Sequence, residues 1–290
     1  MAMDADSPEL RIPDLARAWD VDIERIEATA GSVVAFGHRN EQLVVLKVVR
    51  FPGDEWLSGR MLEAFAGRGV VRMLAHADGA VLLERLVPGT ALADEAIPDD
   101  DATAIIAAVI GRMSPGTVPS NAPTVESWGQ GFERHTAGGS PDIPSLLVEE
   151  AHRIYIGLCA SQTDTRLLHG DLHHENVLLD ARRGWLAIDP KGVVGELAYE
   201  VGAALRNPCR KPELFAAPTT IRRRVDRFAR ELSLDGDRIL EWAFAQAVLA
   251  AIWEIEDHGV LKSGAGWIAL ANAIWPMLSV GAASSSPPRS

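Results

Sequence analysis

The stretch LLHGDLHHENVLLD, residues 167–180, decides the fold of this chain. It crowds three histidines, two aspartates, a glutamate and an asparagine between two apolar runs, where polar groups are costly unless a site uses them. Within it, His169-Gly170-Asp171 and the later Asn176 have the spacing H-x-D-x-x-x-x-N. In a loop of this spacing the aspartate accepts the proton of an attacking hydroxyl and the asparagine holds Mg²⁺. The stretch therefore predicts a catalytic loop for phosphoryl transfer.

A second acidic residue follows downstream, in GWLAIDPKG. The apolar residues that end in Ile188 lead into Asp189, as expected of a short strand that delivers a metal-binding carboxylate. We therefore expect Asp189 to be a second Mg²⁺ ligand. Lys191, two residues later, has two interpretations: another cation that faces the phosphates, or a surface lysine.

One lysine interrupts an apolar strand near the front of the chain, in LVVLKVV. Phosphoryl transfer needs cations on the phosphates, so Lys47 is a candidate for that role. An ammonium among valines and leucines is costly without a partner, which Glu55 or Glu63 is expected to supply. The alternative is a lysine at the solvated edge of the strand. Before it, Gly31 and Ser32 predict a turn whose amides reach phosphate oxygens.

The composition is that of an ordinary globular protein, with 290 residues, 47% hydrophobic content and a formal net charge of −12. That charge disfavours nucleic acid and anionic membranes as partners and would draw a cationic ligand toward an acidic cleft. Two cysteines, Cys159 and Cys209, without a charged and apolar leader, indicate a cytoplasmic location. No apolar run is long enough to span a bilayer.

The character of the chain changes once along its length. Between residues 21 and 86 the pattern favours β-strands and one helix, and after Pro98 it favours helices. The aspartates at 99–101 predict a helix start, because acidic groups stabilise the positive end of a helix dipole. Glycine, proline and serine predict a loop at 114–142. Further helices are expected at 143–160, 219–232, 236–257 and 265–280.

This order predicts two lobes. The first, at 1–86, is a small nucleotide-binding lobe with an antiparallel β-sheet and one helix. The second, at 87–280, is larger, mainly α-helical, and carries catalysis and substrate binding. A disordered tail is expected at 281–290, because that segment cannot pack. The polar cluster then lies at the seam between the lobes.

From the polar cluster to LAYEVGAALRNP, the chain resembles the streptomycin 6-phosphotransferase and hydroxyurea phosphotransferase group of the aminoglycoside-phosphotransferase-like, kinase-fold superfamily. Weaker similarity extends over residues 20–280, and IDPKG is the most discriminating piece. The resemblance implies a two-lobed, protein-kinase-like α+β fold. It also implies an ATP- and Mg²⁺-dependent small-molecule kinase that phosphorylates a hydroxyl of an aminoglycoside or aminocyclitol-type antibiotic.

Carried over position by position, the resemblance implies a role for each motif residue. Asp171 would be the catalytic base, and Asn176 and Asp189 would hold Mg²⁺. Lys47 would contact the α- and β-phosphates of ATP. We also assign His169 to the catalytic group, where it would brace the loop by hydrogen bonds.

The resemblance also places the connection between the lobes at LLERLVPG, where the backbone of Glu84 and Leu86 would meet adenine. Their side chains need not matter, because these contacts would be made by the main chain. In two places the chain departs from the family pattern. The glutamate that pairs with the strand lysine would fall near Ser58, so we assign that role to Glu55. Glu200 stands where relatives usually have aspartate, a position expected to brace the catalytic loop.

Acceptor recognition is expected in the helical lobe, at IWEIEDHG. Glu254 and Asp257 lie three residues apart on one helix face, with Trp253 beside them. An acidic shelf next to an indole suits a cationic or amino-sugar-like small molecule, through charge-assisted hydrogen bonds and cation–π contact. The alternative is a solvated helix end. Arg206 in ALRNP is expected to end a helix and receives no chemical role.

Three other functions remain open at this stage. The acceptor could be an amino sugar or another small metabolite. The chain could be a non-catalytic nucleotide-binding module that keeps the fold. A zinc hydrolase is the third, because His169, His173 and His174 stand close to Asp171 and Glu175. Their spacing differs from the helical H-E-x-x-H arrangement, and such a site leaves the upstream lysine without a role.

Overall fold

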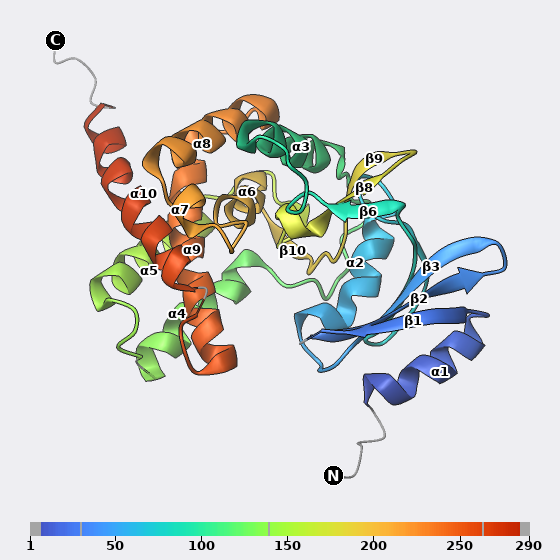
Figure 1. The fold of residues 1–290 in the computed structure, drawn as a ribbon. Coiled ribbons are helices and arrows are strands. Elements are labelled where there is room, and N and C mark those ends of the chain that lie inside the picture. Colours follow the sequence, from blue (N-terminus) through green and yellow to red (C-terminus); the bar gives the residue numbers. More distant parts are fainter. Residues whose placement is uncertain (1–6, 30, 139, 263, 285–290) are drawn as a thin grey trace.

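The computed structural model describes residues 7–29, 31–138, 140–262 and 264–284 and shows two lobes (Figure 1). The N-terminal lobe contains a five-stranded antiparallel sheet with strand order β1-β2-β3-β5-β4. Its strands are β1 (Asp22–Ala28), β2 (Ser32–Arg39), β3 (Gln42–Val49), β4 (Met73–Ala77) and β5 (Ala80–Glu84). β3 lies in the middle of this sheet, so Lys47 is on a central strand and not on a solvated edge.

Helices cover both faces of this sheet. They are α1 (Pro8–Ala18), the 3₁₀ helix η1 (Asp54–Leu57) and α2 (Ser58–Phe65). Ile12 of α1 packs in one apolar cluster with Leu82, whereas Phe65 of α2 packs in the other with Leu83. Adjacent residues of a strand point to opposite faces, so α1 and α2 lie on opposite sides. We expected one helix in this lobe, so α1 is a correction. The buried face of α1 is narrow, with Ile12 and Ala16, and so its sequence shows little helical periodicity of apolar residues.

Short strands connect the two lobes and carry the catalytic loop. They are β6 (Pro88–Ala91), β7 (Arg166–Leu168), β8 (Val177–Asp180), β9 (Gly184–Ala187) and β10 (Val193–Gly195). β6, β8 and β9 form one sheet, and β7 pairs with β10. The catalytic loop leaves β7, passes through the 3₁₀ helix η2 (His174–Asn176) and enters β8. The segment of Asp189 leaves β9 and enters β10. Because β8 pairs with β9 and β7 pairs with β10, the two polar segments are held between paired strands.

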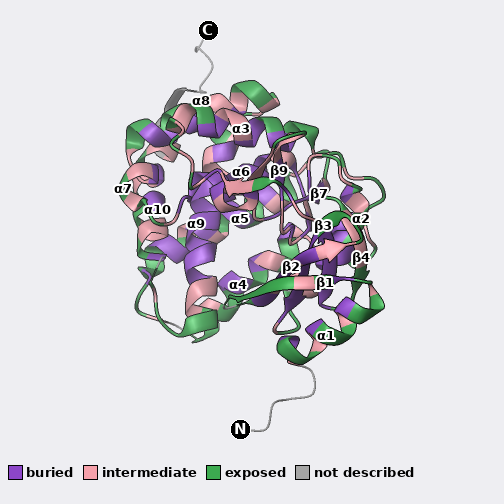
Figure 2. Cartoon of the chain, turned by 45° about the vertical axis from the view of Figure 1, so that its right-hand side comes forward, coloured by how far each residue is buried: buried purple, intermediate pink, exposed green. Residues whose placement is uncertain are grey.

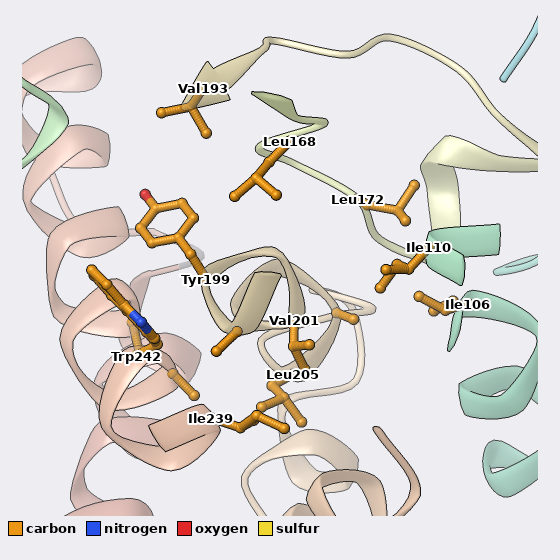
Figure 3. Packing of buried hydrophobic residues seen from close by; sticks show 14 of the residues in the cluster. Ile106, Ile110, Leu168, Leu172, Val193, Tyr199, Val201, Leu205, Ile239 and Trp242 are labelled. Atoms are coloured by element: carbon orange, nitrogen blue, oxygen red, sulfur yellow. The ribbon is translucent and has the colours of Figure 1, made fainter. Parts of the chain in front are cut away.

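The C-terminal lobe is helical and surrounds α9 (Figures 1 and 2). Its helices are α3 (Asp99–Arg112), α4 (Val125–Gly138), α5 (Ser145–Ala160), α6 (Leu197–Leu205), α7 (Pro212–Phe215), α8 (Pro218–Leu232), α9 (Gly236–His258) and α10 (Gly264–Ser284). In α9 every residue at 242–252 is buried. Tyr199 and Trp242 pack edge to face, with Leu168 on the side of Tyr199 and Leu172 on the side of Ile106 and Ile110 (Figure 3). Leu168 and Leu172 belong to the same apolar cluster as the two rings, so the catalytic loop is attached to the core. None of the helices in the described residues is long and apolar enough to cross a membrane.

Two expectations about the helical lobe were wrong. α4 lies inside the segment at 114–142 that we expected to be a loop. Its glycines lower helix propensity, but close packing requires them: a Cβ at Gly129 would lie 2.5 Å from the ring of Tyr155. The predicted start of the disordered tail, at residue 281, is also wrong, because α10 continues to Ser284. Residues 285–290 lie outside the described residues.

Candidate active site

His169 holds the start of the catalytic loop. Its buried ring places Nε2 2.7 Å from the carbonyl oxygen of Ile188 and Nδ1 3.3 Å from the backbone nitrogen of Asp171. Nδ1 therefore accepts from that amide, and Nε2 carries the proton and donates to the carbonyl. Burial lowers the pKa of His169 to about 4, so the ring is neutral at neutral pH. This geometry corresponds to the bracing role expected for His169.

Glu200 of α6 braces the same loop. Its Oε2 accepts from the backbone nitrogen of His169 at 2.6 Å, and its Oε1 accepts from that of Gly170 at 3.2 Å. Burial raises the pKa of Glu200 to about 7, while the backbone hydrogen bonds favour the ionised form. The longer glutamate thus makes the backbone hydrogen bonds expected at this position.

Asp171 is surrounded by three cationic side chains. Arg206 Nη2 lies 3.3 Å from its Oδ1, and Lys191 Nζ lies 3.3 Å from its Oδ2. His173 Nε2 lies 3.7 Å from the same Oδ2. Burial alone would raise the pKa of Asp171, but the neighbouring Lys191, His173 and Arg206 hold that pKa well below its ordinary value. Asp171 is therefore anionic and faces its surroundings as a proton or hydrogen-bond acceptor.

Lys47 lies between two carboxylates. Its Nζ is 2.9 Å from Glu55 Oε2 and 2.9 Å from Asp189 Oδ1. Burial alone would lower the pKa of Lys47, but attraction to Asp189 and Glu55 raises it above the ordinary value. Glu55 belongs to η1, and Glu63 lies instead 4.0 Å from His76. Of the two glutamates considered, the one that pairs with Lys47 is therefore Glu55, the residue assigned in place of the acid missing near Ser58.

The donors next to Lys47 fit the chemistry of Mg²⁺. The backbone nitrogen of Ile188 donates to the carbonyl oxygen of Asn176 at 2.9 Å, which joins the Asn176 and Asp189 segments. Asn176 Nδ2 donates to the Asp171 carbonyl at 2.9 Å, so the Asn176 side-chain oxygen is the atom left for a metal. An amide oxygen and a carboxylate are hard donors of the kind that Mg²⁺ prefers. Asn176 and Asp189 therefore fit the ligand role expected of them.

A pocket of about 760 Å³ opens beside Asp171. It is lined by Gly170, Asp171, His173, Glu175 and Lys191 from the catalytic segments, Ser127, Trp128 and Arg134 from α4, Arg206, Asn207, Cys209, Arg210 and Trp267, and Ala250, Trp253, Glu254, Glu256, Asp257 and His258 from α9. A pocket of this size admits a drug-sized ligand. Trp253, Glu254 and Asp257, predicted for acceptor recognition, thus line the same pocket as Asp171.

Comparison with known sequences assigns the family. A sequence model described as aminoglycoside/hydroxyurea antibiotic resistance kinase matches residues 15–258. The chain belongs to this family. It is 34% identical over 221 residues to streptomycin 3''-kinase of Klebsiella pneumoniae, covering 73% of this chain and 80% of that protein. It is 32% identical over 244 residues to hydroxyurea phosphotransferase of Kitasatospora aureofaciens, covering 75% and 67%. The resemblance inferred from the motifs is confirmed.

Solved structures support the fold of this family member. Aminoglycoside phosphotransferase APH(4)-Ia in complex with AMP-PNP and hygromycin B superposes with a TM-score of 0.65 at 15% identity, covering 93% of this chain and 98% of that chain. A choline/ethanolamine kinase family protein from Mesorhizobium loti superposes with a TM-score of 0.67 at 14% identity, covering 97% and 95%. These likenesses confirm the predicted two-lobed, kinase-like α+β fold.

The turn expected to reach phosphate oxygens differs from the prediction in one residue. The backbone nitrogen of Ser32 donates to Thr29 Oγ1 at 3.0 Å, and the carbonyl oxygen of Gly31 accepts from the backbone nitrogen of Arg50 at 2.9 Å. The Ser32 amide is thus used to close the turn and is not available to a phosphate as we expected. Gly31 is exposed, and its amide remains a candidate.

The segment expected to meet adenine is tied to both lobes. The backbone nitrogen of Glu84 donates to the carbonyl oxygen of Arg72 at 3.0 Å, so the carbonyl of Glu84 is the group of this residue left for adenine. The Glu84 side chain has a structural role of its own. Its Oε1 accepts from the backbone nitrogen of Arg72 at 2.7 Å and forms an ion pair with Arg183. Leu86, the other predicted adenine contact, is buried.

Sequence reasoning missed several pocket residues in this member of the antibiotic resistance kinase family. Arg206 was assigned no chemistry, yet it contacts Asp171 and also donates to Gln246 Oε1 at 3.2 Å. The only feature of the sequence that could have pointed to Arg206 was its place as a lone arginine at the end of an apolar helix. Trp128 and Arg134 belong to the unpredicted α4. Trp128 packs on the catalytic loop, where a Cβ at Gly170 would lie 2.8 Å from its ring.

The three histidines of the catalytic segment do not converge on one point. His169 contacts a backbone carbonyl, and His173 Nδ1 lies 2.8 Å from Glu175 Oε2. His174 is buried, burial lowers its pKa to about 3, and neither ring nitrogen has a hydrogen-bond partner within the described ranges. In those same ranges no three His, Cys, Asp or Glu side chains form a group able to hold a metal ion. The geometry does not favour the zinc interpretation.

Proposed function

We propose that this chain is an ATP- and Mg²⁺-dependent kinase that transfers the γ-phosphoryl group to a hydroxyl of an aminoglycoside or aminocyclitol-type antibiotic. One observation carries the proposal: the loop that places Asp171 on the pocket wall also joins, through Asn176, the segment of Asp189 and Lys47. An acceptor pocket and a nucleotide site are thus adjacent. The matched relatives are named streptomycin kinases and a hydroxyurea phosphotransferase, which supports an antibiotic acceptor.

The residues of this chain would divide the work of an in-line transfer. Asp171 orients the acceptor hydroxyl and receives its proton as the new O–P bond forms and the bond to ADP breaks. Because such transition states are loose, orientation matters more than the basicity of Asp171, and its low pKa is compatible with the role. Lys47 holds the α- and β-phosphates. Mg²⁺ on Asn176 and Asp189 would neutralise charge on the β- and γ-phosphates.

The acceptor would bind at the far wall of the pocket. Asp257, Glu254 and Trp253 come from the last turns of α9, where the negative end of the helix dipole also favours a cation. Glu254 already has a structural role, because its Oε2 accepts hydrogen bonds from the backbone nitrogens of Lys262 at 2.8 Å and Gly264 at 2.7 Å. Asp257 and the face of Trp253 are therefore the groups that we assign to an amino or guanidino substituent.

The test is phosphorylation of a panel of acceptors. The chain is incubated with ATP and Mg²⁺ and with streptomycin, other aminoglycosides or amino sugars, and products are detected by mass as an added phosphate. We expect streptomycin or a related aminocyclitol to gain one phosphate. Asp171→Asn should abolish transfer and keep the thermal stabilisation produced by nucleotide. Substantial turnover in that variant would refute the role of Asp171.

The same assay separates the alternatives. Phosphate on an amino sugar alone would identify a metabolite kinase. Stabilisation by nucleotide without any phosphorylated product would indicate a non-catalytic nucleotide-binding module. We place the reaction in the cytoplasm, because ATP is available there and both cysteines of the chain, Cys159 and Cys209, are free thiols.

A further inference from the structure

The segment at 189–192 forms a rigid arch over the catalytic loop. Asp189 and Gly192 have positive φ angles of +57° and +78°, and Pro190 restricts the backbone between them. The backbone nitrogen of Gly192 donates to the carbonyl oxygen of His169 at 3.0 Å. A Cβ at Gly192 would lie 2.4 Å from Met61 Sδ, so the arch is also packed against α2. The backbone that carries Asp189 and Lys191 is therefore held in place.

The two charged side chains of the arch point to different places. Asp189 Oδ1 lies 2.9 Å from Lys47 Nζ, on the side of the predicted nucleotide site. Lys191 Nζ lies 3.3 Å from Asp171 Oδ2 and lines the acceptor pocket, whose lining does not include Lys47. The arch thus presents the carboxylate of Asp189, a predicted metal ligand, on one side and the ammonium of Lys191 on the other. Lys47 and Lys191 would approach the triphosphate from different directions.

The three cations around Asp171 differ in how far their side chains are exposed. The Arg206 side chain is 9% exposed and is also held by Gln246, and His173 is held by Glu175. The Lys191 side chain is 33% exposed and ends in a compact ammonium on a flexible stem. Of these three, Lys191 is the one best placed to change partners during a reaction.

We propose that Lys191 is a catalytic residue that contacts the transferring phosphoryl group from the acceptor side, an inference that rests on the proposed function. Before transfer its ammonium pairs with anionic Asp171. As the acceptor oxygen bonds to phosphorus and the bond to ADP breaks, the acceptor proton passes to Asp171 and cancels that charge. The ammonium then binds the oxygens of the phosphoryl group, where negative charge remains, and Lys191 itself exchanges no proton.

The experiment compares Lys191→Met, Lys191→Arg and the control Lys211→Met. Lys211 is exposed and does not line the pocket. Losing one positive charge from the transition state should lower kcat about 100-fold in Lys191→Met and leave KM for ATP almost unchanged. Lys191→Arg should recover a large part of kcat, and Lys211→Met should behave as wild type.

A second readout keeps this inference separate from the identity of the acceptor. The slow hydrolysis of ATP by the same three variants is measured without any antibiotic, and folding is followed by thermal unfolding with and without a non-hydrolysable ATP analogue. Hydrolysis should fall in Lys191→Met, and stabilisation by the analogue should persist. If wild type hydrolyses ATP but phosphorylates no acceptor tested, only the proposed acceptor fails. A Lys191→Met kcat within about threefold of wild type, or an effect on KM alone, would overturn the role of Lys191.

Discussion

Lys47 shows at the residue scale how a buried charge is made tolerable. Only 11% of its side chain is exposed, and the two carboxylates at 2.9 Å compensate the loss of hydration. A lysine in an apolar strand could be read from the sequence. The sequence did not decide whether Glu55 or Glu63 pairs with this lysine. The pairing depends on η1, which precedes α2 and turns Glu55 toward the sheet.

The first prediction concerns Lys47→Met. It removes the cation between Glu55 and Asp189 and leaves two carboxylates that repel each other and the triphosphate. Loss of a charge-assisted contact to the phosphates costs about 3 kcal/mol, so KM for ATP should rise on the order of 100-fold. Steady-state kinetics with varied ATP measure this, with exposed Lys211→Met as the control. An unchanged KM for ATP would exclude Lys47 from nucleotide binding.

At the element scale, the aspartate run at the start of α3 does more than the sequence suggested. The run was interpreted as acidic groups that stabilise a helix start. In the structure Asp99 also ties α3 to α8, because its carboxylate lies 2.6 Å from Arg224 Nη2 and 2.7 Å from Arg223 Nη2. Arg224 is almost fully buried and also donates to the carbonyl oxygens of Ala204 and Asn207. The sequence held no sign of this pairing, because its partners are more than 120 residues apart.

The second prediction concerns Asp99→Asn. Breaking a buried pair by removing one partner costs about 3 kcal/mol, so the free energy of unfolding at pH 7 should fall by that amount. Burial raises the pKa of Asp99, but Arg224 and Arg223 outweigh it and lower the pKa below 3.8. The stabilisation is therefore present above 3.8 and is lost as the pH falls through the lower folded value.

Urea unfolding at a series of pH values tests this prediction. The difference between wild type and Asp99→Asn should shrink as the pH drops below 3.8. The control is Asp101→Asn, an exposed member of the same run, which should cost less than about 1 kcal/mol. A difference that stayed constant with pH would contradict the assignment.

At the scale of the whole molecule, contacts beyond the chain connection hold the two lobes together. Glu84 at the end of the N-terminal sheet forms an ion pair with Arg183 in the turn between β8 and β9. The backbone nitrogen of Ala181 in the same turn donates to the carbonyl oxygen of Val87 at 2.7 Å. The segment predicted to meet adenine is therefore attached to the catalytic lobe at two points. The orientation of the lobes and the nucleotide site should depend on each other.

The third prediction concerns Arg183→Met. A partly buried ion pair of this kind contributes about 1 kcal/mol. Because it holds the segment predicted to meet adenine, a loss of that size from nucleotide binding should raise KM for ATP roughly fivefold, while KM for the acceptor stays nearly constant. Arg182→Met removes the neighbouring exposed arginine and should leave both constants unchanged. Equal increases in both KM values would show that the ion pair stabilises the protein without positioning the connection between the lobes.

What the sequence alone determined was which residues are the candidates for the reacting groups. Asp171 and Asn176 are separated by a fixed spacing, Lys47 interrupts an apolar strand, and Asp189 follows one. Local spacing and the cost of a buried charge are properties of short segments, so these four could be read without coordinates.

What only the tertiary structure decided was their surroundings. Arg206 reaches Asp171, Trp128 packs on the catalytic loop, and the Ser32 amide is taken by Thr29. The first two contacts join elements far apart in the chain, and the third depends on how a turn closes. Packing of distant side chains depends on the whole core, and no local pattern encodes it.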